Sequence, residues 1–227
     1  MAEVPTHPME KYNETEKISY LSIVSRVCCV DGTIRSEEAQ AIEILINKLW
    51  VSSSGKANVM QAAFSQANWC PDADNVISLN DQEVGYSCIS DACFVALADG
   101  NMNGSETQYI DDIGRYFKIS SDKISGIIQI QEKLKQLKEI PPDSAQFRDM
   151  FRDISATAGS IGVPLAAVCV SGVWGLSAAG ITSGLAALGS LVGGGMLAGA
   201  IAVVPALAIG GWYLAKGIFN LIFPKKK

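Results

Sequence analysis

Four acidic residues recur in two matching segments and have the chemistry to bind a cation. Residues 30–38 read VDGTIRSEE and residues 98–106 read ADGNMNGSE, and each segment places a glutamate seven residues after an aspartate. The acidic positions correspond in pairs, Asp31 with Asp99 and Glu38 with Glu106. Carboxylate oxygens are the ligands that hard divalent cations prefer. If the two segments pack about a pseudo-twofold axis, these carboxylates converge on one place.

A regular EF-hand is excluded at both segments. Its first two side-chain ligands would lie four and two residues before each aspartate. Those positions hold residues without side-chain oxygens, namely Val27, Cys29, Val95 and Leu97. Two interpretations therefore stay open. Either the four carboxylates hold a divalent cation, or each one only stabilises its own turn and helix start, where the helix dipole favours negative charge.

Apolar residues recur at helical spacing on both sides of each Asp-Gly pair. They are Ile18, Leu21, Val24, Val27, Cys28, Ala39, Ile42, Leu45, Ile46 and Leu49, and then Ile89, Ala92, Val95, Ala96, Ile110, Ile113 and Phe117. Gly32 and Gly100 are suited to end a helix because glycine adopts positive φ at little cost. Ser36 or Ser105 is expected to cap the next helix. The pattern predicts a duplicated helix–turn–helix unit.

Further helical patterns complete the first part of the chain. They lie at residues 57–69, 121–139 and 143–155. The alternation typical of strands is missing. We therefore predict one all-α domain over residues 1–145.

The duplicated pattern resembles that of a known family. The sequence A/V-D-G-x-I/M-x-x-x-E, followed by an amphipathic helix and repeated, is similar to the tellurite-resistance TerB family and its DjlA-type relatives over roughly residues 10–140. The first copy has Val30 where the second has Ala98. The resemblance implies an all-helical cytosolic domain, often fused to membrane or signalling parts in bacterial stress and defence systems. It also implies that the acidic residues of the repeated turns are metal ligands.

The C-terminal part of the chain has a different composition. Residues 154–215 form an unbroken run without Asp, Glu, Lys, Arg or His. A helix needs about 20 apolar residues to cross a bilayer, so this run supplies two spans and at most three. Its glycines are spaced in fours, at Gly180, Gly184, Gly189, Gly193, Gly195 and Gly199. Such small-xxx-small spacing lets helices approach closely in lipid.

We therefore predict a Gly-rich membrane region over residues 146–227, with a transmembrane helical hairpin and an interfacial or third segment. Charged and aromatic residues flank it as interface anchors, at Arg148, Arg152, Trp212, Tyr213, Lys216, Lys225, Lys226 and Lys227. Positive charge at both ends favours two spans, with the N-terminal domain and the C-terminus in the cytoplasm of a bacterium. The alternative is a hairpin buried in a soluble core or oligomer.

Composition and motifs also limit the classes of function that the chain can have. A net charge of −5 argues against a broad nucleic-acid surface. No nucleophile–base–acid set or phosphate-binding loop is visible, and the single histidine is His7, so an enzyme is not expected. The six cysteines have neither a CxxC motif nor nearby histidines, which favours reduced, buried thiols over a zinc site.

These features together predict a membrane effector. The helical domain would sense a ligand and control an oligomeric pore, or a disruption of the bilayer, built from the Gly-rich hairpin of several copies. The ligand is left open among a divalent cation, a nucleotide or oligonucleotide, and a partner protein. Two alternatives stay open as well: a membrane-anchored scaffold without a pore, and a soluble metal-binding stress protein.

Overall fold

The structure, a computed structural model of the chain, describes residues 7–64, 81–141 and 144–169. Within these ranges every regular element is helical, which confirms the predicted all-α class for this part of the chain. The elements are η1 (Pro8–Lys11), α1 (Glu14–Ser25), η2 (Arg26–Cys29), α2 (Ser36–Lys48), α3 (Ser53–Ala63), α4 (Gln82–Ala96), α5 (Gly104–Tyr116), α6 (Ser121–Leu137), α7 (Ala145–Ile161) and α8 (Leu165–Cys169). Most of the predicted transmembrane hairpin, including its six spaced glycines, and the anchors from Trp212 onward lie outside the described residues.

Two three-helix units follow each other with a constant displacement along the chain. Helices α2 and α5 have the same length, so the interval between their first residues equals the interval between their last residues. The same interval separates Glu14, which begins α1, from Gln82, which begins α4. It also separates Ser53 from Ser121, the first residues of α3 and α6. The helix starts therefore agree with the predicted duplication. Each unit also includes a third helix, which the sequence analysis predicted at residues 57–69 and 121–139 but did not assign to the repeat.

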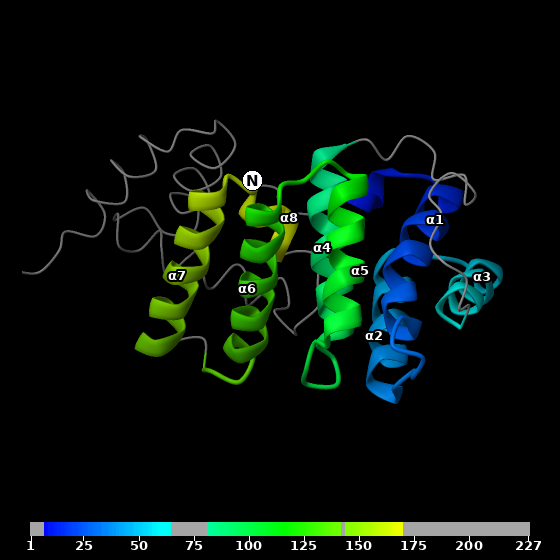
Figure 1. Cartoon of the computed structure of the whole chain (residues 1–227), viewed down its shortest axis with the longest axis horizontal. Coiled ribbons are helices and arrows are strands. Elements are labelled where there is room, and N and C mark those ends of the chain that lie inside the picture. Colours follow the sequence, from blue (N-terminus) through cyan, green and yellow to red (C-terminus); the bar gives the residue numbers. More distant parts are fainter. Residues whose placement is uncertain (1–6, 65–80, 142–143, 170–227) are drawn as a thin grey trace, which may run out of the picture.

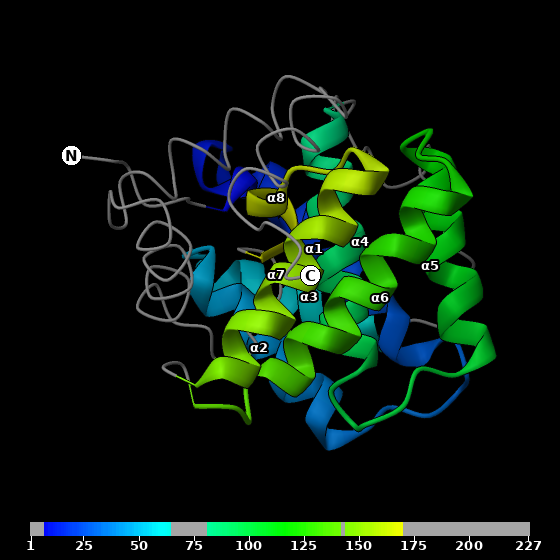
Figure 2. The same ribbon diagram turned by 90° about the vertical axis from the view of Figure 1, so that its left-hand side faces the viewer.

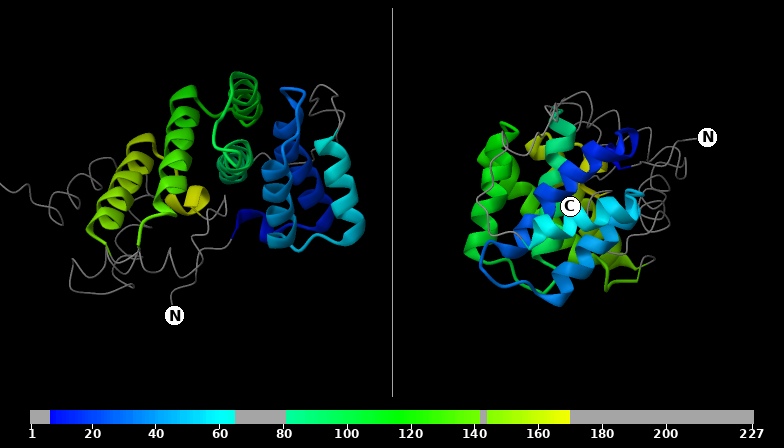
Figure 3. Two further views of the ribbon diagram at one scale, coloured as in Figure 1. Left: turned by 90° about the horizontal axis from the view of Figure 1, so that it is seen from below. Right: turned by 90° about the vertical axis from the view of Figure 1, so that its right-hand side faces the viewer.

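α4 lies at the centre of the molecule. Every residue from Val84 to Ala96 is buried, and α4 contacts α1, α2, α5, α6 and α8. In Figure 1, α4 and α5 stand between the α1–α2–α3 unit and the α6–α7 pair, and the view from below in Figure 3 shows the same order. The close contact between α4 and the end of α5 depends on Gly85, where a Cβ would lie 2.8 Å from the Cβ of Phe117.

α7 and α8 continue the packed helices beyond residue 145, where the sequence analysis placed the end of the helical domain. α7 packs against α6, as Figure 2 shows, and α8 packs against α4 and α6. The buried side chains of α7 include Phe147, Phe151, Ile154 and Ala158. The predicted anchors Arg148 and Arg152 lie on this helix, and Arg152 Nη1 is 3.0 Å from Asp149 Oδ1. No helix in the described ranges has the length and hydropathy that crossing a membrane requires.

Candidate functional site

The two Asp-Gly turns meet where α2 and α5 begin. We name this cluster the repeat junction, and its side chains are Asp31, Arg35, Glu38, Asp99, Asn103 and Glu106. Arg35 Nε lies 3.0 Å from Asp99 Oδ2, and Asn103 Nδ2 donates a hydrogen bond to Asp31 Oδ2 at 2.9 Å. Arg35 and Asn103 occupy equivalent positions of the two repeats. Each repeat thus contacts the aspartate of the other, and the structure brings the four acidic residues together.

Each aspartate uses one oxygen locally and the other across the junction. Asp31 Oδ1 accepts a hydrogen bond from the Thr33 N–H at 2.9 Å. The equivalent Asp99 Oδ1 accepts one from the Asn101 N–H at 3.0 Å. The glycines between them have positive φ, +81° at Gly32 and +118° at Gly100. Each aspartate therefore stabilises its own turn and also takes part in the contacts between the two repeats.

The two glutamates lie beneath the aspartates and are almost completely buried. Glu38 is 0% exposed and Glu106 is 1% exposed. Oε2 of each accepts a hydrogen bond from a backbone N–H at its helix start, from Arg35 at 2.8 Å and from Asn103 at 2.7 Å. Oε1 of each accepts no hydrogen bond. These two oxygens lie 3.6 and 3.9 Å from Arg35 Nη1.

Burial of two carboxyl groups beside each other changes their acidity. Burial raises the pKa of Glu38 from 4.5 to about 7, and the neighbouring Glu106 raises it further against the lowering effect of the Arg35 N–H. Burial raises the pKa of Glu106 as well. Because two adjacent buried carboxylates repel each other, the pair retains a proton at pH values where exposed glutamates are ionised.

The residues that cap α2 and α5 differ from the prediction. Asn103, rather than Ser105, is the N-cap of α5, and its Oδ1 accepts a hydrogen bond from the Glu106 N–H at 3.0 Å. Arg35, rather than Ser36, is the N-cap of α2 and makes no side-chain capping bond. Neither residue is a carboxylate, so neither was predicted as part of the site. Their common position, four residues after each aspartate, is the signal that could have revealed them.

Comparison with known proteins supports this description. The family described as "Tellurite resistance protein TerB" matches residues 17–129. The chain contains a TerB-like helical domain. No curated protein and no solved structure is detectably similar to the chain. The matched range holds the whole repeat junction and runs from α1 into α6.

The repeat junction of this TerB-like domain has oxygen donors that suit a hard cation, and a guanidinium lies among them. Four carboxyl groups and one carboxamide are oxygen donors that calcium and magnesium accept. Two buried oxygens, Glu38 Oε1 and Glu106 Oε1, accept no hydrogen bond. Across the described ranges, however, no group of three or more His, Cys, Asp or Glu side chains is placed to hold a metal ion. At the junction the guanidinium of Arg35 lies among the carboxylates instead.

Other reactive side chains of the domain are in structural positions. His7 is buried, its Nε2 lies 3.0 Å from Asp91 Oδ2, and its Nδ1 accepts a hydrogen bond from the Met9 N–H. Tyr20 donates to the same Asp91 oxygen at 2.6 Å. Although burial by itself raises the pKa of Asp91, its contacts with His7, Lys48 and Tyr20 lower the pKa below the ordinary value. This network fastens η1 and α1 to α4.

The described cysteines form no disulfide, and burial raises the pKa of their thiols. Burial raises the pKa of Cys169 to about 12, and it raises the pKa of Cys28, Cys88 and Cys93 well above the ordinary value. Such thiols are poor nucleophiles. TerB domains form a non-enzymatic helical family, and for the whole chain the absence of enzymatic activity stays a prediction.

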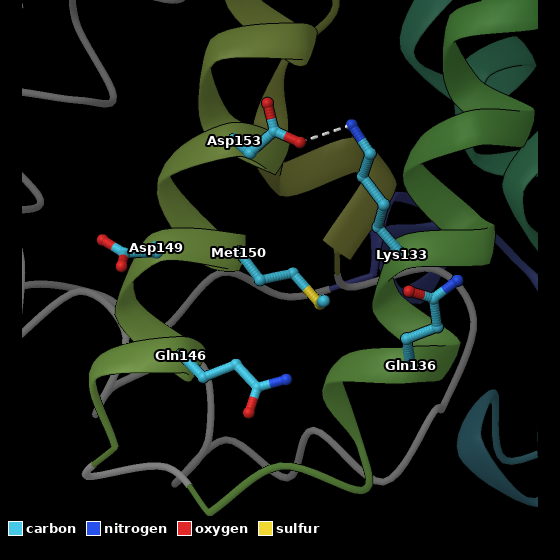
Figure 4. A pocket seen from close by; sticks show the side chains of 6 residues that line it. All are labelled: Lys133, Gln136, Gln146, Asp149, Met150 and Asp153. Atoms are coloured by element: carbon cyan, nitrogen blue, oxygen red, sulfur yellow. Dashed lines mark hydrogen bonds and ion pairs between the residues drawn. The ribbon is translucent and has the colours of Figure 1, made fainter.

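A groove of about 590 Å³ lies between α6 and α7 of the domain. Figure 4 shows its lining, which consists of Lys133, Gln136, Gln146, Asp149, Met150 and Asp153. Lys133 Nζ and Asp153 Oδ2 are 2.6 Å apart and join the two helices at one end of the groove. The other side chains are two amides, a carboxylate and a thioether, which do not form a nucleophile–base pair.

Proposed function

We propose that this chain is a membrane effector of a bacterial stress or anti-phage defence type. Its TerB-like domain controls the Gly-rich C-terminal region, and several copies assemble that region into a pore or a membrane lesion. The observation that carries the proposal is the packing of α8 against α4 and α6. The uncharged stretch begins at residue 154 inside α7, and its first residues belong to the packing of the helical domain.

The last described residues are held by side chains of two other helices. Ser87 of α4 donates a hydrogen bond to the Ala167 carbonyl at 3.2 Å, and Gln131 of α6 donates one to the Val168 carbonyl at 2.9 Å. Ala167 and Val168 are buried, with 1% and 0% of their surface exposed. These bonds satisfy carbonyls at the end of a helix, which would otherwise need another donor. The helical domain thus holds the start of the uncharged stretch.

α4 gives a physical route from the repeat junction to α8. Leu97, just after α4, accepts a hydrogen bond from Lys135 of α6 at 2.6 Å, and the Asp99 turn follows immediately. Toward the other end of the same helix, Ser87 holds α8. Because α4 is buried from Val84 to Ala96, we expect a shift of the junction to move α4 relative to α6. We expect such a shift to weaken the two bonds that hold α8.

The composition of the remaining tail determines what its release would do. The uncharged run over residues 154–215, with its glycines spaced in fours, favours close helix–helix packing in lipid. Because two hairpin helices cannot enclose a channel by themselves, conduction requires a homo-oligomer. The positive charge at both ends of the tail favours an orientation with the helical domain and the C-terminus on the cytoplasmic side of the bacterial inner membrane.

Reconstitution of the full chain into liposomes with dye release tests this proposal. We expect leakage, which Gly189→Leu with Gly193→Leu abolishes, because bulky side chains prevent close helix packing. Ser87→Ala with Gln131→Leu should increase leakage by weakening the seat of α8. The matched control is Thr157→Ala, which removes an exposed side-chain-to-carbonyl bond within α7 and should leave leakage unchanged.

Each alternative function predicts a different outcome of the same experiment. A scaffold would sediment with the liposomes but cause no leakage under any added stimulus, whether a divalent cation, an oligonucleotide or a cell extract. A soluble stress protein would stay in the supernatant without detergent. Either result would contradict the membrane-effector proposal.

A further inference from the structure

We propose that the guanidinium of Arg35 is the resident cation of the repeat junction and takes the place that a divalent metal ion would need. The side chain contacts all four acidic residues. Its Nη1 lies 3.2 Å from Asp31, 3.6 Å from Glu38 and 3.9 Å from Glu106, and its Nε lies 3.0 Å from Asp99. One positive group thus connects both aspartates and both buried glutamates.

The position of Arg35 on its own helix supports this role. Arg35 is the N-cap of α2 and makes no side-chain capping bond there. Asn, Asp, Ser and Thr are preferred at that position, and the helix dipole disfavours a positive charge at a helix N-terminus. Asn103, at the equivalent position of α5, follows this preference. Arg35 goes against this capping preference in only one of the two repeats. Its contacts with the four carboxyl groups compensate for the unfavourable position.

The distances fit a guanidinium better than a metal ion. Calcium and magnesium bind oxygens at about 2.0–2.6 Å, whereas a planar guanidinium satisfies several carboxylates at hydrogen-bond distance. Glu38 Oε1 and Glu106 Oε1, which accept no hydrogen bond, lie at ion-pair distance from Arg35 Nη1. The Arg35 side chain is 35% exposed. It therefore covers the buried carboxyl pair from the solvent side.

This assignment makes the junction of the wild-type chain independent of divalent cations. Replacing Arg35 by the residue of the second repeat, Arg35→Asn, removes the internal cation and leaves the carboxyl groups without a positive partner from this side chain. We expect this variant to acquire a dependence on divalent cations, with an apparent affinity for Ca²⁺ or Mn²⁺ roughly tenfold or more above that of the wild type, because the competing charge is gone.

The test is thermal unfolding of the full-length chain in detergent, with Ca²⁺, Mg²⁺ or Mn²⁺ or with EDTA, together with calorimetric titration. The wild type should unfold at the same temperature in all conditions, and Arg35→Asn should be stabilised only by the metal ions. Arg35→Lys keeps a positive charge and should respond less than Arg35→Asn. The matched control is Arg115→Asn, an exposed arginine of α5 that pairs with Asp112 and should behave as the wild type.

The outcomes decide between the two cations. If Arg35→Asn gains affinity for a divalent cation and is stabilised by it while the wild type is not, the assignment is supported. If it fails to fold with and without metal ions, or folds and gains no affinity, the assignment is wrong. Stoichiometric binding and stabilisation of the wild type by a divalent cation would also overturn it. None of these results depends on liposome leakage, so the proposed function is tested separately.

Discussion

The two halves of the TerB-like domain share a backbone and differ in what they place on it. Helices α1–α3 and α4–α6 begin at positions displaced by one constant interval along the chain. Even the non-glycine residues with positive φ correspond, because Trp50 and Lys118 have φ of 57° and 55° and are separated by that same interval. The helix starts, and also the ends of α2 and α5, are therefore duplicated.

The side chains at equivalent positions have diverged where the halves meet. Arg35 corresponds to Asn103, and Ile23 of α1 corresponds to Asp91 of α4. Arg35 and Asn103 each bind the aspartate of the other half, one through a guanidinium and the other through an amide. Asp91 accepts a hydrogen bond from Tyr20 of the first half, whereas Ile23 has no polar group. The comparison indicates that duplication provided two similar units and that a few asymmetric residues join them. The predictions below test those residues, from the largest expected effect to the smallest.

Removing the polar anchor that α4 has and α1 lacks should have the largest effect. Asp91→Ala deprives the buried His7 and Tyr20 of their shared acceptor. Leaving buried partners of a charged group unsatisfied costs about 3 kcal/mol or more. We expect the free energy of unfolding, measured by chemical denaturation and circular dichroism, to fall by this amount.

The control for this prediction removes one donor and keeps the acceptor. Tyr20→Phe loses a single hydrogen bond to Asp91 and should cost about 1 kcal/mol. If Asp91→Ala were no more destabilising than Tyr20→Phe, the carboxylate would not be the anchor between η1, α1 and α4.

The buried glutamates, which occupy equivalent positions, should make stability depend on pH. The pKa of Glu38 is about 7 in the folded domain and 4.5 ordinarily, so its protonated form is favoured by folding. This contribution is fully present below pH 4.5 and is lost as the pH rises through 7. We expect the free energy of unfolding to fall by about 2 kcal/mol between pH 5 and pH 8.

Substitution of Glu38 should reduce that dependence. Glu38→Gln removes one of the two buried titrating carboxyl groups, so its pH profile in this interval should be less steep than that of the wild type. Glu37→Gln changes an exposed neighbour and should leave the profile as in the wild type. Equal slopes for Glu38→Gln and the wild type would show that the raised pKa is not the source of the pH dependence.

The helices of the domain could be predicted from the sequence more completely than the side-chain contacts of the repeat junction. The Asp-Gly pairs, the apolar periodicity and the constant displacement between the two segments were enough to predict the duplicated helices, because turns and amphipathic faces depend on local residues. The convergence of the acidic residues was predicted for the case that the two segments pack about a pseudo-twofold axis. The role of Arg35 was not, because its partner Asp99 belongs to the other repeat and only the packing of α2 against the second half brings them together.

The end of the domain was hidden for a related reason. From residue 154 onward the sequence is uncharged, and a helix buried in a protein core and a helix buried in lipid have similar composition. The contacts of Ser87 and Gln131 with α8 come from distant parts of the chain. Sequence periodicity alone therefore could not place Ala167 and Val168 in the helical domain.

Two substitutions that leave side chains of different size can separate the two roles of Asn103. Asn103 caps α5 and donates to Asp31 of the other half. Asn103→Ala should lose both and cost about 1.5 kcal/mol, whereas Asn103→Ser keeps a capping oxygen but cannot reach Asp31 and should cost about 0.5 kcal/mol. Equal losses of unfolding free energy in the two variants would show that the bond to Asp31 adds nothing measurable.

The smallest expected effect tests how far the two backbones agree. Trp50 and Lys118 each follow a helix in the left-handed region, where a Cβ costs about 1 kcal/mol that glycine avoids, although glycine loses more entropy on folding. Trp50→Gly and Lys118→Gly should therefore each stabilise the domain by about 0.5 kcal/mol in denaturation experiments. Trp50 is 85% exposed, so its removal forfeits little buried surface. Gly162→Ala, at φ +65° after α7, should destabilise by a similar amount. Opposite signs for Trp50→Gly and Lys118→Gly would mean that the shared backbone angles do not reflect a shared strain.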